Sequence, residues 1–266
     1  LTGAGNIKFS YSFSYSYSEF DAIKEATRVE DVANHTISNS LSLSYGLKDN
    51  ITLSTGIPFK YKYHRVGTVD SKDVTDLGDL SVNWKYQPIK SGRDLPTLIV
   101  NGGVNVPVGR SPYEIDPGEE LSTSSGIYST SLGVSVSQTS DPVVVFGSMS
   151  ASWPFSVDDI NQKRNEGILD EVDPGPGIGV GMGLAYALSY KLNLNLSISY
   201  SYSFESEYHY KNAPSSESGT SASASMKIGG GYRLSRKQNL NFSFGIPITN
   251  TGSFSFSMST PIEFEL

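Results

Sequence analysis

The sequence is short of residues on which most folded proteins rely. None of its 266 residues is cysteine, and only 18% are charged. Hydrophobic residues make up 37%, below the usual share of about 45–50%, although that class also counts glycine. The lack of cysteine fits an envelope protein that needs no disulfide. A net charge of −7 argues against a nucleic-acid partner.

Long hydrophobic runs are missing as well. No stretch reaches about 18 apolar residues, so the sequence predicts no transmembrane helix. The chain starts at Leu1 without a signal peptide, and we interpret it as a mature or trimmed chain. Since we find no domain boundary, we expect one domain over residues 1–266.

What the sequence does contain is strict alternation. In "IKFSYSFSYSYS", from Ile7 to Ser18, apolar and aromatic residues hold the odd positions, and serine holds all but one of the even positions. Successive side chains of a strand point to opposite faces, so this strand has an aromatic face and a hydroxyl face. Such a strand fits either a soluble β-sandwich or a membrane barrel with lipid-facing aromatics.

The alternation recurs in about twelve segments of about 8–14 residues, close to the 9–11 residues of a tilted membrane strand and longer than the usual soluble strand of about 5–6. An even number suits single-chain bacterial barrels. The segments are residues 7–18, 36–47, 51–63, 80–87, 98–108, 128–136, 143–155, 177–190, 194–204, 221–234, 240–248 and 253–266.

The connections between these segments alternate between short and long. Short links such as "KDN" and "QTSDP" take turns with long ones at residues 19–35, 64–79, 109–126, 156–177 and 205–219. Outer-membrane barrels have short periplasmic turns and long extracellular loops. The sequence therefore predicts an all-β, antiparallel up-and-down barrel of about 12 strands in the bacterial outer membrane, surrounded by lipid, with both termini periplasmic.

The second face of the strands is predicted to line the bore. It carries mostly serine and glycine, which favours an open or pluggable bore over a filled one. Its few charges are mainly basic, which favours anions unless they pair with neighbours. The predicted pore-lining residues are Lys8, Ser10, Ser12, Ser14, Ser16, Lys60, Lys62, Lys85, Ser197, Ser199, Ser201, Lys227, Arg233, Ser255 and Ser257.

No catalytic, metal or cofactor site is expected. The three histidines, His35, His64 and His209, fall at or beyond the outer strand ends, and serine is too abundant for one to stand out. "GIGVGMG" lies on a strand and precedes no helix, so it is no phosphate cradle. The long outer links are acidic, but they show no ligand spacing for a cation.

The stretch "DLGDLSVNWKYQPIKSGRDLPTLIVNGGVNVPVG", residues 76–109, resembles the outer-membrane barrel family of the MetA pathway of phenol degradation, and so do "YGLKDNITLSTGIPF" and "SDPVVVFGSMSASWPF". Within that neighbourhood the chain most resembles the FapF-type functional-amyloid secretion channels of pseudomonads. That resemblance implies a homotrimer of twelve-stranded barrels that pass an unfolded polypeptide outward. It also implies a periplasmic plug and coiled coil, which would precede residue 1.

Three functions follow from this reading. The first is a passive conduit that exports an unfolded polypeptide. The second is an uptake channel for small aromatic or other hydrophobic molecules, and the third is a non-conducting structural or adhesive surface barrel. A wide conductance that a peptide blocks would favour the first. A narrow bore with an aromatic lining or a lateral opening would favour the second, and no conductance the third.

Overall fold

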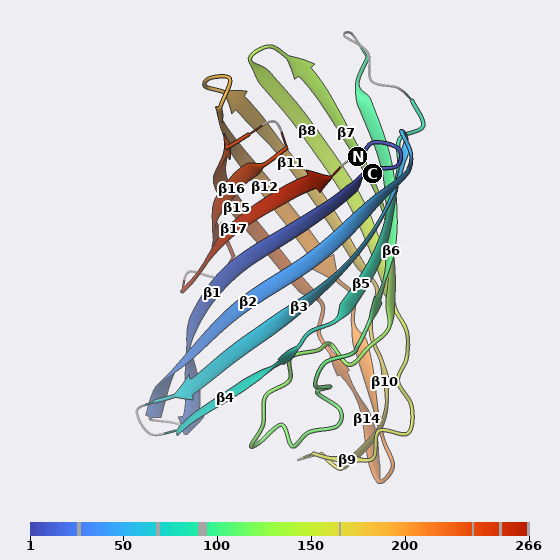
Figure 1. The fold of residues 1–266 in the computed structure, drawn as a ribbon. Helices are drawn as coiled ribbons and strands as arrows, with labels where there is room; N and C mark the ends of the chain where they lie inside the picture. Colours follow the sequence, from blue (N-terminus) through green and yellow to red (C-terminus); the bar gives the residue numbers. More distant parts are fainter. Residues whose placement is uncertain are drawn as a thin grey trace.

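A closed β-barrel forms the body of the molecule (Figure 1). The computed structural model describes residues 1–25, 28–67, 70–89, 95–164, 166–235, 237–249 and 252–264, and the regular elements in these ranges are all β-strands. Within the described part, no helix has the length and apolarity to span a membrane.

Twelve antiparallel strands make the wall of the barrel, as the sequence predicts. Neighbours in the wall are neighbours along the chain, and β1 closes the ring on β17 in an unbroken register from Ile7–Phe264 to Ser18–Ser253. The strands are β1 (Ile7–Glu25), β2 (Arg28–Lys48), β3 (Ile51–Val66), β5 (Leu80–Tyr86), β6 (Thr97–Val106), β7 (Ser129–Ser140), β8 (Val143–Pro154), β11 (Gly177–Ala187), β12 (Leu192–Ser203), β15 (Ser221–Arg233), β16 (Asn239–Pro247) and β17 (Ser253–Phe264).

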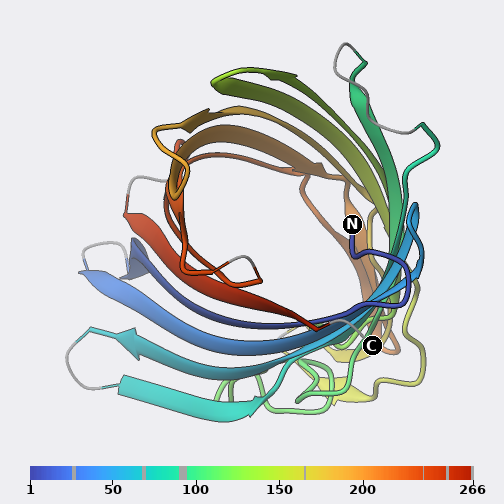
Figure 2. The ribbon, with the colours of Figure 1, turned by 45° about the horizontal axis from the view of Figure 1, so that its top comes forward.

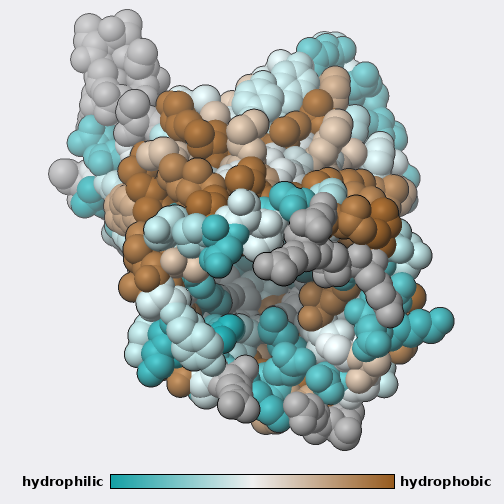
Figure 3. Space-filling model, turned by 90° about the horizontal axis from the view of Figure 1, so that it is seen from above, coloured by the Kyte–Doolittle hydropathy of each residue, from teal (hydrophilic) through white to brown (hydrophobic). Residues whose placement is uncertain are grey.

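The register keeps the two faces of the wall chemically separate. Gly179 of β11 lies opposite Ser150 of β8 and Ser201 of β12, whereas the next residue, Val180, lies opposite Met149 and Tyr200. Apolar side chains of this second set are widely exposed, as lipid-facing residues are in an isolated chain. Viewed along the barrel, apolar atoms lie on its flanks and hydrophilic atoms border the central hollow (Figure 3).

Aromatic rings cover glycines on neighbouring strands. Trp84 lies opposite Gly102, and Phe242 lies opposite Gly230. A Cβ atom added to these glycines would lie 2.7 and 2.8 Å from the ring of the partner. Only glycine leaves room for a ring to lie against the backbone, and such pairs help to fix strand register.

The strands continue beyond the predicted ends. The link at residues 19–35 was expected to be a loop, but β1 and β2 stay paired as far as Glu25 and Arg28. The next link contains β4 (Asp70–Leu77), which pairs with the end of β3. A continued ladder satisfies backbone groups that a loop would leave to water. Residues 26–27 and 68–69 lie outside the described part of these links.

A separate four-stranded sheet fills two further links that the sequence predicts as loops. Its order is β14 (Ala213–Ser218), β13 (Ser206–Tyr210), β10 (Ile168–Asp173) and β9 (Gln162–Lys163). We call it the cap sheet. Leu169 and Val172 are completely or almost completely buried, with relative exposures of 0% and 1%, so the cap sheet has a small core of its own.

The two ends of the barrel differ. The cap sheet lies at one end, and both chain termini lie at the other (Figure 1), where the backbone N–H of Ala4 donates to the carboxylate of Asp49 in the short turn between β2 and β3. The shortness of this turn agrees with the periplasmic end of outer-membrane barrels. The periplasmic position of both termini stays a prediction.

Candidate transport pathway

Serine pairs line a long part of the wall. The hydroxyl oxygens of Ser199 and Ser225 lie 2.9 Å apart, and those of Ser201 and Ser223 lie 2.7 Å apart. A third pair joins β16 to β17, with 2.8 Å between the hydroxyls of Ser243 and Ser257. The hydroxyls thus bond to one another across strands, and the surface they form is polar, small and uncharged.

The predicted pore-lining serines come together in the structure. Ser14 and Ser16 of β1 lie in register with Ser257 and Ser255 of β17, on the face that also carries the hydroxyls of β2. A cavity of about 290 Å³ lies on this face. It is lined by residues including Ser16, Ser18, Asn34, Thr36, Ser225, Lys227, Gly245 and Ser255. The lining of the bore by these residues remains a prediction, and the register supports it.

The predicted basic residues do not form one ring. Lys60 lies near the cap end, where its ammonium group donates a hydrogen bond of 2.9 Å to the carbonyl of Thr123. Lys8, near the start of β1, and Lys85, near the end of β5, belong to the opposite end. Arg233 lies at the rim, with its guanidinium carbon 5.1 Å from the ring centre of Tyr190.

The first six residues are fixed to the barrel at the short-turn end. The backbone N–H of Thr2 donates to the hydroxyl of Thr52 at 3.0 Å, and the N–H of Gly5 donates to the carbonyl of Gly46 at 2.8 Å. The side-chain amide of Asn6 donates to Glu263 of β17 at 3.1 Å. The N-terminus therefore lies inside the outline of the barrel when the molecule is viewed obliquely (Figure 2).

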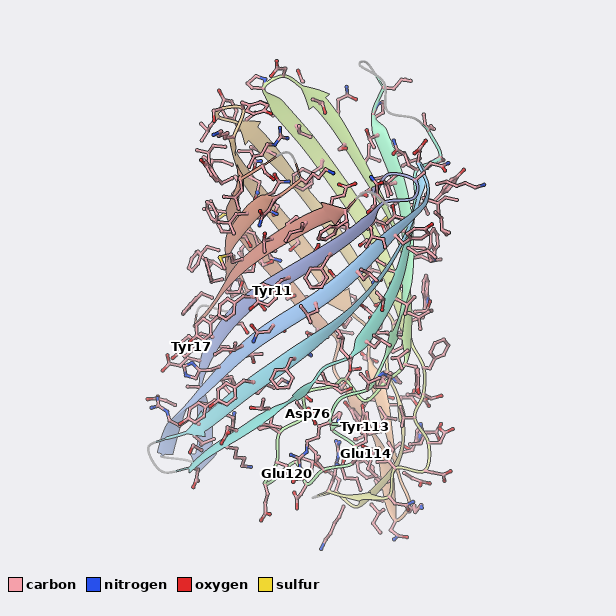
Figure 4. All side chains as sticks on the ribbon, in the orientation of Figure 1. Tyr11, Tyr17, Asp76, Tyr113, Glu114 and Glu120 are labelled. Carbon is pink, nitrogen blue, oxygen red and sulfur yellow. The ribbon has the colours of Figure 1, made fainter. Side chains whose placement is uncertain are left out.

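The connection between β6 and β7, residues 107–128, is pinned to the cap end of the barrel. We call it the inner loop. Besides the bond from Lys60, the N–H of Ser125 donates to the carboxylate of Asp79 at 3.1 Å, and the hydroxyl of Ser124 donates to the same carboxylate. Thr123 is completely buried. Figure 4 shows Tyr113, Glu114 and Glu120 of this loop at the same end of the barrel as Asp76 of β4.

The sequence at the β4–β5 junction explains where this loop is anchored. Phe59 of β3 pairs with Leu77, whereas Gly56 pairs with Ser81, so the register shifts by one residue between β4 and β5. Extra residues of this kind bend a strand and re-aim its side chains. In the described part of the chain, β4 pairs with β3 alone, so its other edge is an interruption of the wall beside the inner loop.

The inner loop packs against the cap sheet, and this packing buries part of Tyr113. Partial burial raises the pKa of the Tyr113 hydroxyl, and the nearby Tyr208 of β13 adds to the shift. Gln162 of β9 donates to the carbonyl of Pro112 at 2.8 Å. A cavity of about 720 Å³ lies between the two segments, lined by Pro112, Ile115, Asp116, Pro117, Gly118, Glu120, Leu121, Ser122, Lys163, Arg164 and Glu166.

Sequence reasoning missed an apolar patch on the hydroxyl face. Ile99, Val144 and Phe146 lie on the same face as Ser135 and Ser137, and with them they line a cavity of about 320 Å³. Their signal in the sequence is a break of phase, since each occupies a position where the alternation would place a small or polar residue. We call these three residues the bore patch.

The histidines do not gather at the bore. His64 lies 2.6 Å from the side-chain oxygen of Asn34, and His35 lies 2.9 Å from the hydroxyl of Tyr15. Tyr11 and Tyr17, on the same strand as Tyr15, project from the outer face of β1 (Figure 4). His209 belongs to the cap sheet and contacts Ser215 and Asp173 there.

A closed antiparallel barrel of twelve long strands, each with an apolar face and a small polar face, defines an outer-membrane channel fold. Among solved structures, the chain is similar to the COG4313 outer-membrane channel from Pseudomonas putida F1, with 12% identity over 99% of this chain and 97% of that one and a TM-score of 0.72. The chain belongs to the family described as "Putative MetA-pathway of phenol degradation", whose model matches residues 18–256.

Two further solved structures share the fold. The transport unit of the autotransporter AIDA-I from Escherichia coli has 10% identity over 97% of this chain and 90% of that one, with a TM-score of 0.59. A mutant of the TodX monoaromatic hydrocarbon channel has 9% identity over 98% and 90%, with a TM-score of 0.50. The family comparison confirms the resemblance to the MetA-pathway barrels, whereas the FapF-type assignment is not shown and stays a prediction.

Proposed function

We propose that this barrel takes up small aromatic and other apolar molecules across the outer membrane. The bore patch carries this proposal. It places three apolar side chains, one of them aromatic, on a face that is otherwise mostly small or polar. A small apolar molecule gains by leaving water at such a patch, whereas a hydrated ion does not.

The bore patch should bind a small aromatic molecule weakly, which suits transport rather than storage. An aromatic pair contributes roughly 0.5–1.5 kcal/mol beyond the area that it buries, so a patch with one ring, Phe146, would hold a small aromatic molecule weakly. Serine and threonine residues, Ser135, Ser137, Ser148 and Thr97, make up much of the rest of the cavity lining. Conduction requires binding that is favourable enough for entry and weak enough for release.

The relatives favour this function over the export of a polypeptide. The family is described by phenol degradation, and one structural relative is called a monoaromatic hydrocarbon channel. The reported relatives are channels and a transport unit rather than enzymes. Lys60 and Asp79 anchor the inner loop at the cap end. We propose that the loop narrows the entrance there, which suits a small molecule better than an unfolded chain. The amyloid cargo and the homotrimer stay predictions of the FapF resemblance alone.

Uptake by intact cells tests the proposal. A bacterium without a channel for aromatic compounds expresses either the unaltered chain or Phe146→Ser, and uptake of a radiolabelled monoaromatic compound is measured. We expect the unaltered chain to raise the initial rate and Phe146→Ser to abolish most of that gain. Phe244→Ser is the control, since Phe244 is exposed on the lipid-facing side of β16. The control should retain the gain.

Planar-bilayer recordings of the same proteins separate the other two functions. Large conductance steps that an unfolded Ser/Gly/Asn-rich peptide blocks, with no gain in aromatic uptake, would replace our proposal with the polypeptide conduit. If neither conductance nor a gain in aromatic uptake is measured, while heat-dependent gel migration shows normal folding, the results would favour a structural or adhesive barrel.

A further inference from the structure

Three side chains of the cap sheet converge although the sequence separates them. Asp173 is the last residue of β10, and Glu207 lies directly opposite it on β13. His209 is two residues further along β13, so it lies on the same face as Glu207. One potential ligand atom from each of the three, two carboxylate oxygens and an imidazole nitrogen, lies within 4.8 Å of the other two.

The distances suit a shared ion. Nε2 of His209 lies 3.2 Å from Oδ2 of Asp173 and 3.7 Å from Oε2 of Glu207. Zinc binds imidazole nitrogen at about 2.0–2.1 Å and carboxylate oxygen at about 2.0–2.2 Å, so ligands at the corners of a tetrahedron lie roughly 3.4 Å apart. The two observed separations bracket that value.

The other nitrogen of the imidazole is also held. Nδ1 of His209 lies 2.9 Å from the hydroxyl of Ser215 on β14. When Nδ1 donates its proton to that hydroxyl, Nε2 carries a lone pair and faces two carboxylates. A metal-binding histidine usually has such a partner on its second nitrogen, which fixes the tautomer and the orientation of the ring.

We propose that Asp173, Glu207 and His209 bind one divalent transition-metal ion of the zinc class on the outer surface of the channel. Imidazole favours zinc and its neighbours over calcium and magnesium, which prefer oxygen ligands alone. With three protein ligands, water completes a tetrahedron. The side chains are 34–55% exposed, so an ion reaches the site directly from solvent.

A second reading of the same contacts is a Ser–His–Asp set, because Ser215, His209 and Asp173 form a chain of contacts. Such a set uses one carboxylate on the far nitrogen, whereas here Glu207 lies beside Nε2 as well. The second carboxylate favours a cation over a nucleophile, and the test below distinguishes the two.

Calorimetric titration of the detergent-solubilised full chain, made without an affinity tag, tests the site with Zn²⁺ and then with Ca²⁺. We expect one Zn²⁺ per chain and at least tenfold weaker binding of Ca²⁺. Asp173→Asn, Glu207→Gln and His209→Ala should each weaken Zn²⁺ binding at least tenfold, and Ser215→Ala should weaken it about 10–100-fold. X-ray absorption at the zinc edge should show one imidazole ligand.

Glu217→Gln is the matched control. Glu217 of β14 pairs in register with Glu207 and carries the same charge, but it is not among the three grouped ligands. It should change the affinity less than threefold. If Glu217→Gln weakens binding as much as Glu207→Gln, or if no saturable Zn²⁺ binding occurs, the cluster is only an acidic surface and the proposal fails. Labelling of Ser215 by a fluorophosphonate would replace the metal site with a nucleophile.

Discussion

Two parts of the barrel wall differ in how regularly their strands pair. From β8 through β15 the register has no interruption, and small residues face small residues, as Gly179 faces Ser150 and Ser201. Along β3 the register shifts by one residue between β5 and β4, β4 pairs with β3 alone in the described part of the chain, and Asp79 at the junction binds the inner loop. The regular part gives the bore its shape, and the irregular part anchors the loop that we propose to narrow its cap end.

The largest expected effect concerns the regular part. Ile198 and Ser199 are neighbours near the middle of β12, and the alternation puts Ile198 towards lipid and Ser199 towards the bore. Ile198→Lys should lower the free energy of unfolding by about 2–4 kcal/mol, because it places a charge in the lipid near the bilayer midplane. Urea unfolding in lipid vesicles measures this.

Ser199→Lys is the control, since the same charge then meets water in the bore. It should cost well under half as much and change the ion selectivity in planar bilayers. Equal destabilisation by the two lysines would mean that the inside and outside of the wall are assigned wrongly.

The next effect contrasts glycines in the two parts. A Cβ on Gly109 would lie 1.9 Å from the carbonyl oxygen of Leu77, whereas the nearest atom to a Cβ on Gly179 would be the hydroxyl oxygen of Ser150, at 2.9 Å. Gly109→Ala should therefore force the inner loop away from β4, with a loss of about 1–3 kcal/mol and a higher open-channel current.

Gly179→Ala should be nearly neutral in both unfolding and conductance, because a serine hydroxyl can rotate away. Should Gly109→Ala leave the conductance unchanged, the contact between Gly109 and β4 would have no part in restricting the bore.

The smallest expected effect compares single hydrogen-bonding groups. Asp79→Asn keeps the shape of the anchor but removes the charge that Ser124 and Ser125 bind, so we expect a loss of about 1 kcal/mol and more frequent opening. Ser201→Ala removes a hydroxyl pair of the wall, and because water in the bore replaces it, the cost should be about 0.5 kcal/mol. Single-channel recordings should show altered gating in Asp79→Asn alone.

The sequence predicts the regular part well because its information is local. Alternation with period two identifies each strand, and the phase identifies the faces, so a pairing within a hairpin, such as Gly179 with Ser201, follows once the turn is placed. The bore patch was within reach by the same logic, since Phe146 and its two partners break the phase. The three breaks are easily overlooked because regular alternation surrounds each of them.

The irregular part could not be predicted in this way. The anchor joins Asp79 to Ser125, and the cap-sheet cluster joins Asp173 to His209, so each depends on how distant segments fold back. The acidic residues of the outer links show no ligand spacing because their neighbours in space come from another hairpin. The strand β4 was missed because "HRVGTVDSKDVTDLGD" lacks the apolar alternation of the wall strands.

A reversible disulfide between the inner loop and the barrel wall tests most directly whether the loop controls uptake. The chain has no cysteine, so the pair Asp79→Cys and Ser125→Cys would be its only thiols, placed where the inner loop meets the wall. The control pair, Ser199→Cys and Ser225→Cys, links β12 to β15 away from the loop. We predict that oxidation of the first pair lowers uptake of a radiolabelled monoaromatic compound and that reduction restores it, while the control pair changes nothing. Unchanged uptake with the first pair fully oxidised would contradict the proposal that the inner loop controls entry to the bore.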